Sequence, residues 1–224
     1  MVIRDILHAQ VASAESFVDT LAAPLFPEER ALVAGAADKR RHEFATARAC
    51  ARTALAELGV PPVPILRGER GSPVWPPGIV GSITHCAGYR AAVVAYATQI
   101  STIGIDAEPN APLPNGVIDI ISLPLERSQL QLLATERPDV CWDRLIFSAK
   151  ESIYKAWFPL TRRWLGFEDA AVAINEAEAT FGVRLLAPTP LASGFPLGNF
   201  TGRWLVSGGV ILTAVTVPVQ RTVP

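Results

Sequence analysis

The chain has 224 residues, of which half are apolar and 18% are charged, and its formal net charge is −1. This length permits one large domain or two smaller ones, and the apolar share is high enough to build a buried core. A net charge this close to zero argues against a dedicated nucleic-acid-binding protein.

The N-terminus carries Arg4, Asp5 and His8 within its first ten residues, which argues against a signal peptide, and no apolar run approaches the length of a membrane span. The cysteines are too far apart for a C-x-x-C pair, which argues against a disulfide framework or a zinc site. We therefore expect a cytoplasmic protein with reduced thiols and no contact with membrane.

The first strongly periodic segment covers residues 38–58 and predicts a helix, which Gly59 and Pro61 end. Its apolar stripe consists of Phe44, Ala47, Ala51, Leu55 and Leu58. Its polar side carries Arg40, Arg41, Arg48 and Arg52. These arginines form either an ordinary solvated face or a phosphate-binding face, and few acids on the helix neutralise them.

A loop rich in proline and glycine follows at residues 60–78 and contains the segment Arg67-Gly68-Glu69-Arg70-Gly71. Its glycines would let the backbone approach a ligand, and its arginines could meet phosphates, although an ordinary turn explains the pattern equally well. Residues 79–84, 91–96 and 102–106 then predict strands, with a turn at 86–88. His85 follows the first of these strands, beside Ser82 and Thr84.

The third predicted strand ends in two carboxylates, Asp106 and Glu108, and Pro109 stops it. Residues i and i+2 of a strand face the same side, so these carboxylates point together. Such a pair suits Mg²⁺, which prefers oxygen ligands and keeps positions open for phosphate. Two solvated acids at a polar strand end are the alternative.

Residues 111–138 are irregular in pattern, with helical character near 125–134. A second strong helix is predicted at 142–158, ahead of Pro159, with Ile146, Ala149, Ile153 and Trp157 as its buried stripe. An adjoining face carries Lys150, Glu151, Tyr154 and Lys155. Glu151 and Lys155 lie one turn apart, which on its own predicts only an exposed salt bridge.

Four strands are predicted after this helix, at 170–174, 181–186, 200–206 and 210–217, the last two joined by a hairpin at 207–209. Each half of the chain thus supplies a helix and then strands, which predicts an α+β protein. From this order we expect two similar lobes, residues 1–108 and 109–224, in one compact unit, although no residue-level repeat supports the symmetry.

Three motifs in this order resemble the fingerprint of the Sfp-type 4′-phosphopantetheinyl transferases, and most of all its actinobacterial members. They are Gly81-Ser82-Ile83-Thr84-His85-Cys86, Gly104-Ile105-Asp106-Ala107-Glu108 and Phe147-Ser148-Ala149-Lys150-Glu151-Ser152-Ile153-Tyr154-Lys155-Ala156-Trp157. The likeness covers roughly residues 38–170, and three ordered motifs are far more specific than one.

The resemblance implies transfer of the phosphopantetheine arm of coenzyme A to a serine of an apo acyl or peptidyl carrier protein, with release of 3′,5′-ADP. It also implies a monomer of two pseudo-symmetric α+β lobes, with coenzyme A in the cleft between them. The metal site that it implies holds Mg²⁺, which Mn²⁺ can replace, and is formed by Asp106, Ala107, Glu108 and Glu151. The carrier could belong to polyketide, non-ribosomal peptide, siderophore or lipid synthesis.

The resemblance further implies a set of residues that bind coenzyme A: Arg40, Arg48, Arg67, Gly68, Glu69, Arg70, Thr84, His85, Asp106, Lys150 and Lys155. Lys155 would face the diphosphate, while Phe147, Tyr154 and Trp164 are candidates for a pantetheine channel. A serine hydroxyl needs a base to accept its proton, and Glu151 is the predicted base. Two alternatives are a non-catalytic module that binds coenzyme A or a carrier protein, and a Mg²⁺-dependent nucleotide diphosphate hydrolase.

Overall fold

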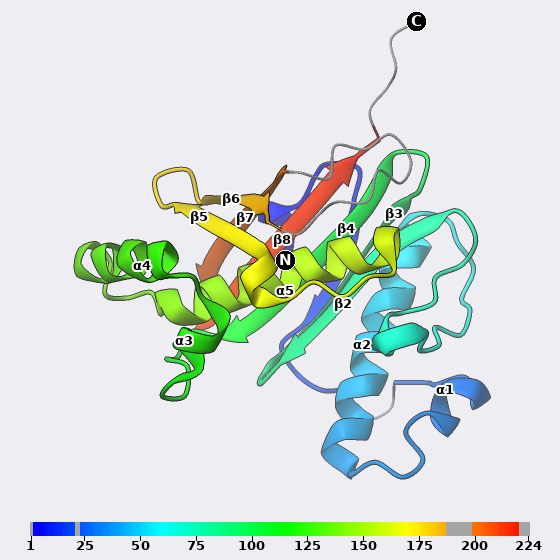
Figure 1. Ribbon diagram of the computed structural model, residues 1–224. Coiled ribbons are helices and arrows are strands. Elements are labelled where there is room, and N and C mark those ends of the chain that lie inside the picture. Colours follow the sequence, from blue (N-terminus) through cyan, green and yellow to red (C-terminus); the bar gives the residue numbers. More distant parts are fainter. Residues whose placement is uncertain (1, 21–22, 187–198, 220–224) are drawn as a thin grey trace, which may run out of the picture. The chain divides into compact units, whose positions relative to one another are not determined.

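The computed structural model describes residues 2–20, 23–186 and 199–219, and it combines two β-sheets with helices (Figure 1). The predicted α+β class is therefore confirmed, while the cleft and the symmetry of the lobes stay predictions. The chain divides into two compact units. Unit 1 consists of the chain up to Ile103 and the segment from Thr216 onward, and unit 2 consists of Gly104–Val215.

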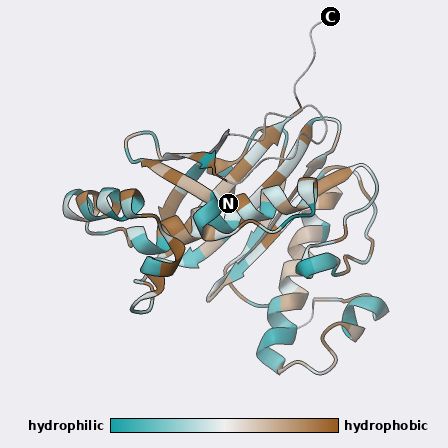
Figure 2. Ribbon diagram, viewed as in Figure 1, coloured by the Kyte–Doolittle hydropathy of each residue, from teal (hydrophilic) through white to brown (hydrophobic). Residues whose placement is uncertain are grey.

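Unit 1 contains a three-stranded antiparallel sheet in the order β1-β3-β2. Its strands are β1 (Ala12–Ser16), β2 (Ile79–Cys86) and β3 (Tyr89–Tyr96). Its helical segments are η1 (Ile3–Ile6), α1 (Pro27–Ala31), α2 (Asp38–Glu57) and η2 (Glu69–Gly71). The long helix α2 agrees with the predicted segment, and hydrophilic residues colour its first turns in Figure 2.

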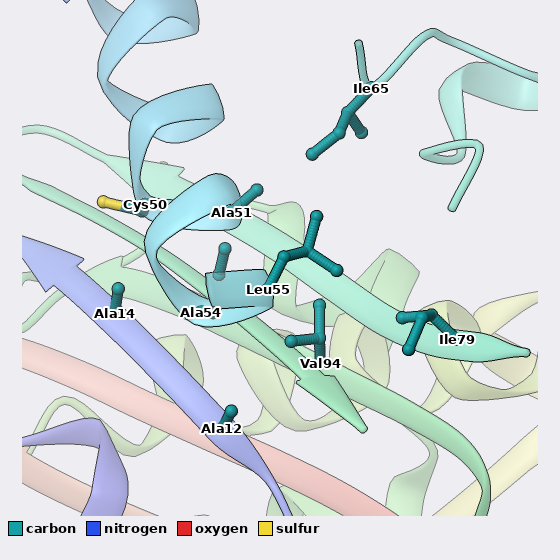
Figure 3. Packing of buried hydrophobic residues seen from close by; sticks show 10 residues of the cluster. Ala12, Ala14, Cys50, Ala51, Ala54, Leu55, Ile65, Ile79 and Val94 are labelled. Carbon is teal, nitrogen blue, oxygen red and sulfur yellow. The ribbon is translucent and has the colours of Figure 1, made fainter. Parts of the chain in front are cut away.

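The core of unit 1 lies between α2 and the sheet (Figure 3). Ala51, Ala54 and Leu55 are fully buried on α2 and pack with Ala14 of β1 and Val94 of β3. Alanines at this interface let the helix approach the strands closely, because they add little volume between the two backbones. Neither β1 nor α1 is evident from the sequence pattern, since both are five residues long and β1 consists of small and polar residues.

Unit 2 is built on a five-stranded sheet in the order β4-β8-β7-β6-β5. Its strands are β4 (Ile100–Pro109), which begins in unit 1, β5 (Ala170–Asn175), β6 (Thr180–Leu185), β7 (Asn199–Ser207) and β8 (Val210–Pro218), which ends in unit 1. Its helical segments are α3 (Val117–Ile121), α4 (Pro124–Glu136), α5 (Trp142–Thr161) and η3 (Phe167–Asp169). The four strands predicted after residue 169 are all present, and each begins and ends within two residues of its predicted bounds.

Helix α5 has the buried stripe that its periodicity predicts, since Ile146, Ala149, Ile153 and Trp157 are at most 2% exposed. The expectation that Pro159 stops this helix is wrong, because α5 continues to Thr161. Proline has a helical φ but cannot donate a hydrogen bond to the carbonyl oxygen of residue 155, so the helix continues for only two residues beyond it. The helix ends where Arg162 adopts a left-handed conformation.

None of the helices in the described ranges is both long enough and apolar enough to cross a membrane.

Candidate active site

The predicted carboxylate strand lies directly against α5, because a glycine removes the side chain between them. A Cβ atom on Gly104 would overlap the carbonyl oxygen of Ser152 and lie 2.6 Å from the backbone nitrogen of Ala156. Only glycine therefore permits this approach of β4 to the helix. It brings the carboxylate end of β4 close to the polar face of α5.

Lys155 joins this polar face to the strand. Its ammonium donates a hydrogen bond of 2.6 Å to Oδ1 of Asp106, and the two side chains are 28% and 6% exposed. The helical spacing predicted a salt bridge from Lys155 to Glu151, whereas the structure pairs Lys155 with Asp106. Lys155 instead connects two of the three motifs.

Arg144, which was not among the predicted site residues, binds the second carboxylate of β4. Its guanidinium donates to Glu108 at 3.0 Å and to the carbonyl oxygens of Ala111 and Pro112 at 3.0 and 2.9 Å. It therefore fixes both Glu108 and the segment that follows the strand. Arg144 lies seven residues before Glu151, so helical periodicity places both on one face and could have revealed it.

The environment of the site disfavours the ionised forms of Glu108 and Glu151. Burial raises the pKa of Glu151, and the charges of Asp106 and Glu108 raise it further, while Lys155 opposes the change. Burial and Asp106 likewise raise the pKa of Glu108 against the effect of Arg144. The charges of neighbouring carboxylates thus make ionisation of Glu108 and Glu151 less favourable.

Three carboxylates that repel one another provide the oxygen ligands that Mg²⁺ prefers. Within the described ranges, however, no three His, Cys, Asp or Glu side chains are arranged as a ready-made metal site. Oδ1 of Asp106 contacts Lys155 and Oε2 of Glu108 contacts Arg144, so cationic side chains already compensate part of the negative charge. Ala107 is buried and has no side-chain donor, so only its main chain could serve the predicted metal site.

A cavity of about 130 Å³ lies beside Glu151 in unit 2. It is lined by Lys150, Glu151, Tyr154, Trp164, Leu165, Gly166, Phe167 and Ala170. The structure thus brings together Tyr154 and Trp164, two candidates for the pantetheine channel, whose rings lie 5.1 Å apart. The third candidate, Phe147, does not line the cavity but packs 5.9 Å from the ring of Phe167.

Lys150 is turned into the protein next to this cavity. Its ammonium donates to Glu126 at 2.9 Å and to the carbonyl oxygen of Phe167 at 2.7 Å. Burial lowers the pKa of Lys150, while Glu126 opposes the change. Its predicted contact with coenzyme A stays a prediction.

A second group of predicted residues meets in unit 1, around a cavity of about 130 Å³. Arg40, Arg48, Arg67 and His85 all line it. The guanidinium carbons of Arg48 and Arg67 lie 4.2 and 5.4 Å from the ring centre of Phe44, and Arg40 contacts His85. Three arginines and one acid, Glu43, line this cavity, and Glu43 pairs with Arg40 at 3.3 Å. The positive charge that remains suits an anionic ligand.

The face of α2 that carries these arginines is not uniformly solvated. Arg48 is 5% exposed and donates to the carbonyl oxygen of Ile65 at 2.8 Å. Burial, together with the charges of neighbouring arginines, lowers the pKa of Arg48 to about 10, although Glu29 opposes this. Arg52 pairs with Glu29 of α1 at 3.0 Å, an acid that the pattern of α2 alone could not reveal.

The loop at 67–71 is a tight turn. Gly68 donates its N–H to Ser72 at 2.7 Å, and Arg70 and Gly71 both have positive φ angles. Thr84 is buried on β2, and strand alternation directs it to the face opposite His85. The predicted contacts of Gly68, Glu69, Arg70 and Thr84 with coenzyme A stay predictions.

Comparison with known proteins identifies the family to which this chain belongs. A family model described as the 4′-phosphopantetheinyl transferase N-terminal domain matches residues 28–95. A second, described as the 4′-phosphopantetheinyl transferase superfamily, matches residues 102–195, which include the carboxylate strand and α5. The chain belongs to the 4′-phosphopantetheinyl transferase superfamily and is an enzyme of that class.

Three bacterial relatives cover most of the chain. The 4′-phosphopantetheinyl transferase Svp of Streptomyces mobaraensis is 56% identical over 193 residues, 86% of this chain and 78% of the relative. PptT of Mycobacterium tuberculosis is 51% identical over 210 residues, 92% of this chain and 91% of the relative. Npt of Nocardia iowensis is 50% identical over 221 residues, 95% of this chain and 98% of the relative. They confirm the predicted likeness to the actinobacterial Sfp-type enzymes.

Proposed function

We propose that this chain transfers the phosphopantetheine arm of coenzyme A to a serine of an apo acyl or peptidyl carrier protein, with Mg²⁺ as its metal ion. The observation that carries the proposal is the grouping of Glu151 and Lys155 with Asp106 and Glu108, beside an aromatic cavity. This grouping joins a candidate base, a cation and candidate metal ligands within unit 2.

The proposed reaction exchanges one phosphorus–oxygen bond for another. The serine oxygen attacks the phosphorus that carries the pantetheine arm, and the bond from this phosphorus to the bridging oxygen of the diphosphate breaks. Its electron pair leaves with 3′,5′-ADP, and Glu151 accepts the serine proton, either directly or through a water molecule. Lys155 stabilises the charge that develops on the diphosphate.

Mg²⁺ would be held by Asp106, Glu108 and Glu151 and would supply positive charge to the diphosphate oxygens. The raised pKa values of Glu108 and Glu151 support this assignment, because burial and the neighbouring carboxylates both disfavour their charged forms, and a bound cation would offset both effects. Lys155 would then be free to turn from Asp106 toward the substrate.

The arginine cavity of unit 1 is proposed to bind the phosphates of coenzyme A through Arg40, Arg48, Arg67 and His85. Arg48 supports this role, because an anion would compensate the cost of burying its guanidinium. The exposed Arg67 offers a guanidinium that is not committed to the core. Unit 1 thus contributes binding, and unit 2 contributes the chemistry.

The test compares Glu151→Gln with Arg67→Gln, two changes that each remove one charge. We expect Glu151→Gln to reduce the rate of transfer by at least about 100-fold while the Kd for coenzyme A changes little, since general-base catalysis contributes about 10²–10⁴-fold. We expect Arg67→Gln to weaken coenzyme A binding. Calorimetry with coenzyme A and a transfer assay on an apo carrier protein measure both. Near-normal transfer by Glu151→Gln would overturn the assignment.

A further inference from the structure

A buried ion pair lies one residue from the proposed base. Lys150 of α5 and Glu126 of α4 are joined at 2.9 Å, and their side chains are only 2% and 3% exposed. Neither charge is screened by solvent, so each depends on the other and on neighbouring polar groups for compensation.

Glu126 uses both of its carboxylate oxygens to join elements of unit 2. Oε1 accepts the N–H of Val172 in β5 at 2.7 Å. Oε2 accepts the N–H of Leu123 at 2.6 Å, at the start of α4, in addition to the ammonium of Lys150. One side chain therefore links α4, α5 and β5.

The second hydrogen bond of Lys150 reaches the wall of the cavity beside Glu151. It goes to the carbonyl oxygen of Phe167 at 2.7 Å, and Phe167 lines this cavity together with Lys150 and Glu151. The ammonium therefore connects the helical turn that carries Glu151 with Phe167, another residue that lines the cavity.

We propose that Lys150 is a positioning residue, which with Glu126 holds Glu151 and Phe167 in place, and that its charge does not bind the phosphates of coenzyme A. This inference rests on the proposed function, because it assigns a role relative to Glu151. An ammonium with two short internal contacts and 2% exposure would have to break both to reach a ligand. Of the two lysines next to Glu151, Lys155 is thus the one available to the substrate.

The experiment uses Lys150→Met, Glu126→Gln and the double variant, with Lys39→Met as the control at an exposed lysine. Kinetics on an apo carrier protein give kcat and the KM for coenzyme A, and calorimetry gives its Kd. We expect each single change to lower kcat by about tenfold or more, with KM and Kd within about twofold of the wild type. The double variant should be no worse than either single variant, because it leaves no unpaired buried charge.

Coenzyme A binding also reports that a variant is folded, so loss of kcat with normal Kd supports positioning. A rise of tenfold or more in the Kd of Lys150→Met, with Glu126→Gln unchanged, would overturn the proposal and make Lys150 a phosphate ligand. Additive losses in the double variant would also overturn it. Failure of the proposed function is a distinct result, since the wild type and Lys39→Met would then transfer nothing.

Discussion

Glu151 lies where its own ionisation is unfavourable. It is half-buried, and the carboxylates of Asp106 and Glu108 add to the effect of burial in raising its pKa. A raised pKa brings a carboxylate closer to the range in which it can accept a proton from a hydroxyl group. The same environment makes the charged residue costly to the folded state.

This cost has a predictable dependence on pH. Because the folded state holds the Glu151 proton more tightly than the unfolded state, the contribution of Glu151 to stability falls as pH rises from its unfolded pKa through its raised folded pKa. Gln is uncharged throughout, so Glu151→Gln should be more stable than the wild type at pH 7.5 by about 1 kcal/mol. The difference should shrink toward pH 5.

Urea unfolding at pH 5, 6 and 7.5, with EDTA present to exclude metal ions, measures this difference. Glu136→Gln, a change at an exposed position, serves as the matched control and should show no comparable trend. A Glu151→Gln variant that is less stable than the wild type at pH 7.5 would contradict the electrostatic account of the site.

At the scale of elements, the contact between β4 and α5 decides whether the site can form. It depends on the absence of a side chain at Gly104, where a methyl group would meet the backbone of Ser152 and Ala156. We expect Gly104→Ala to destabilise the protein by about 3 kcal/mol, because neither the strand nor the helix backbone can yield easily.

The matched control is Gly182→Ala on β6, where an added Cβ meets no atom within 4 Å. Its effect on the free energy of unfolding should stay within about 0.5 kcal/mol. Thermal or urea unfolding of both variants measures the contrast. Equal stabilities for the two variants would show that β4 and α5 are not packed backbone against backbone.

Helical periodicity was sufficient to predict the buried stripe of α5, because burial follows the same 3.6-residue repeat as the side chains. It could not predict the partner of Lys155. A lysine one turn after Glu151 fits a salt bridge within the helix equally well, and nothing in a local pattern states that Asp106 lies nearer. Glu126 was missed for the same reason, since its partners come from separate elements.

At the scale of the whole molecule, each of the two units carries its own part of the proposed chemistry. Unit 1 holds the arginine cavity around Phe44, and unit 2 holds the carboxylates and the aromatic cavity. Three ordered motifs were enough to predict the family, which the relatives confirm. The sequence could not show that Arg48 is buried, because its burial depends on the loop around Ile65 that packs over α2.

The central claim is metal-dependent transfer of phosphopantetheine to a protein, and intact-protein mass spectrometry tests it most directly. An apo carrier protein is mixed with this enzyme, coenzyme A and Mg²⁺, and a parallel sample contains EDTA. The account predicts that the carrier gains the mass of one phosphopantetheine group and that EDTA abolishes the gain. Transfer that persists in EDTA would contradict the metal site, and no gain on any acyl or peptidyl carrier would contradict the proposed reaction.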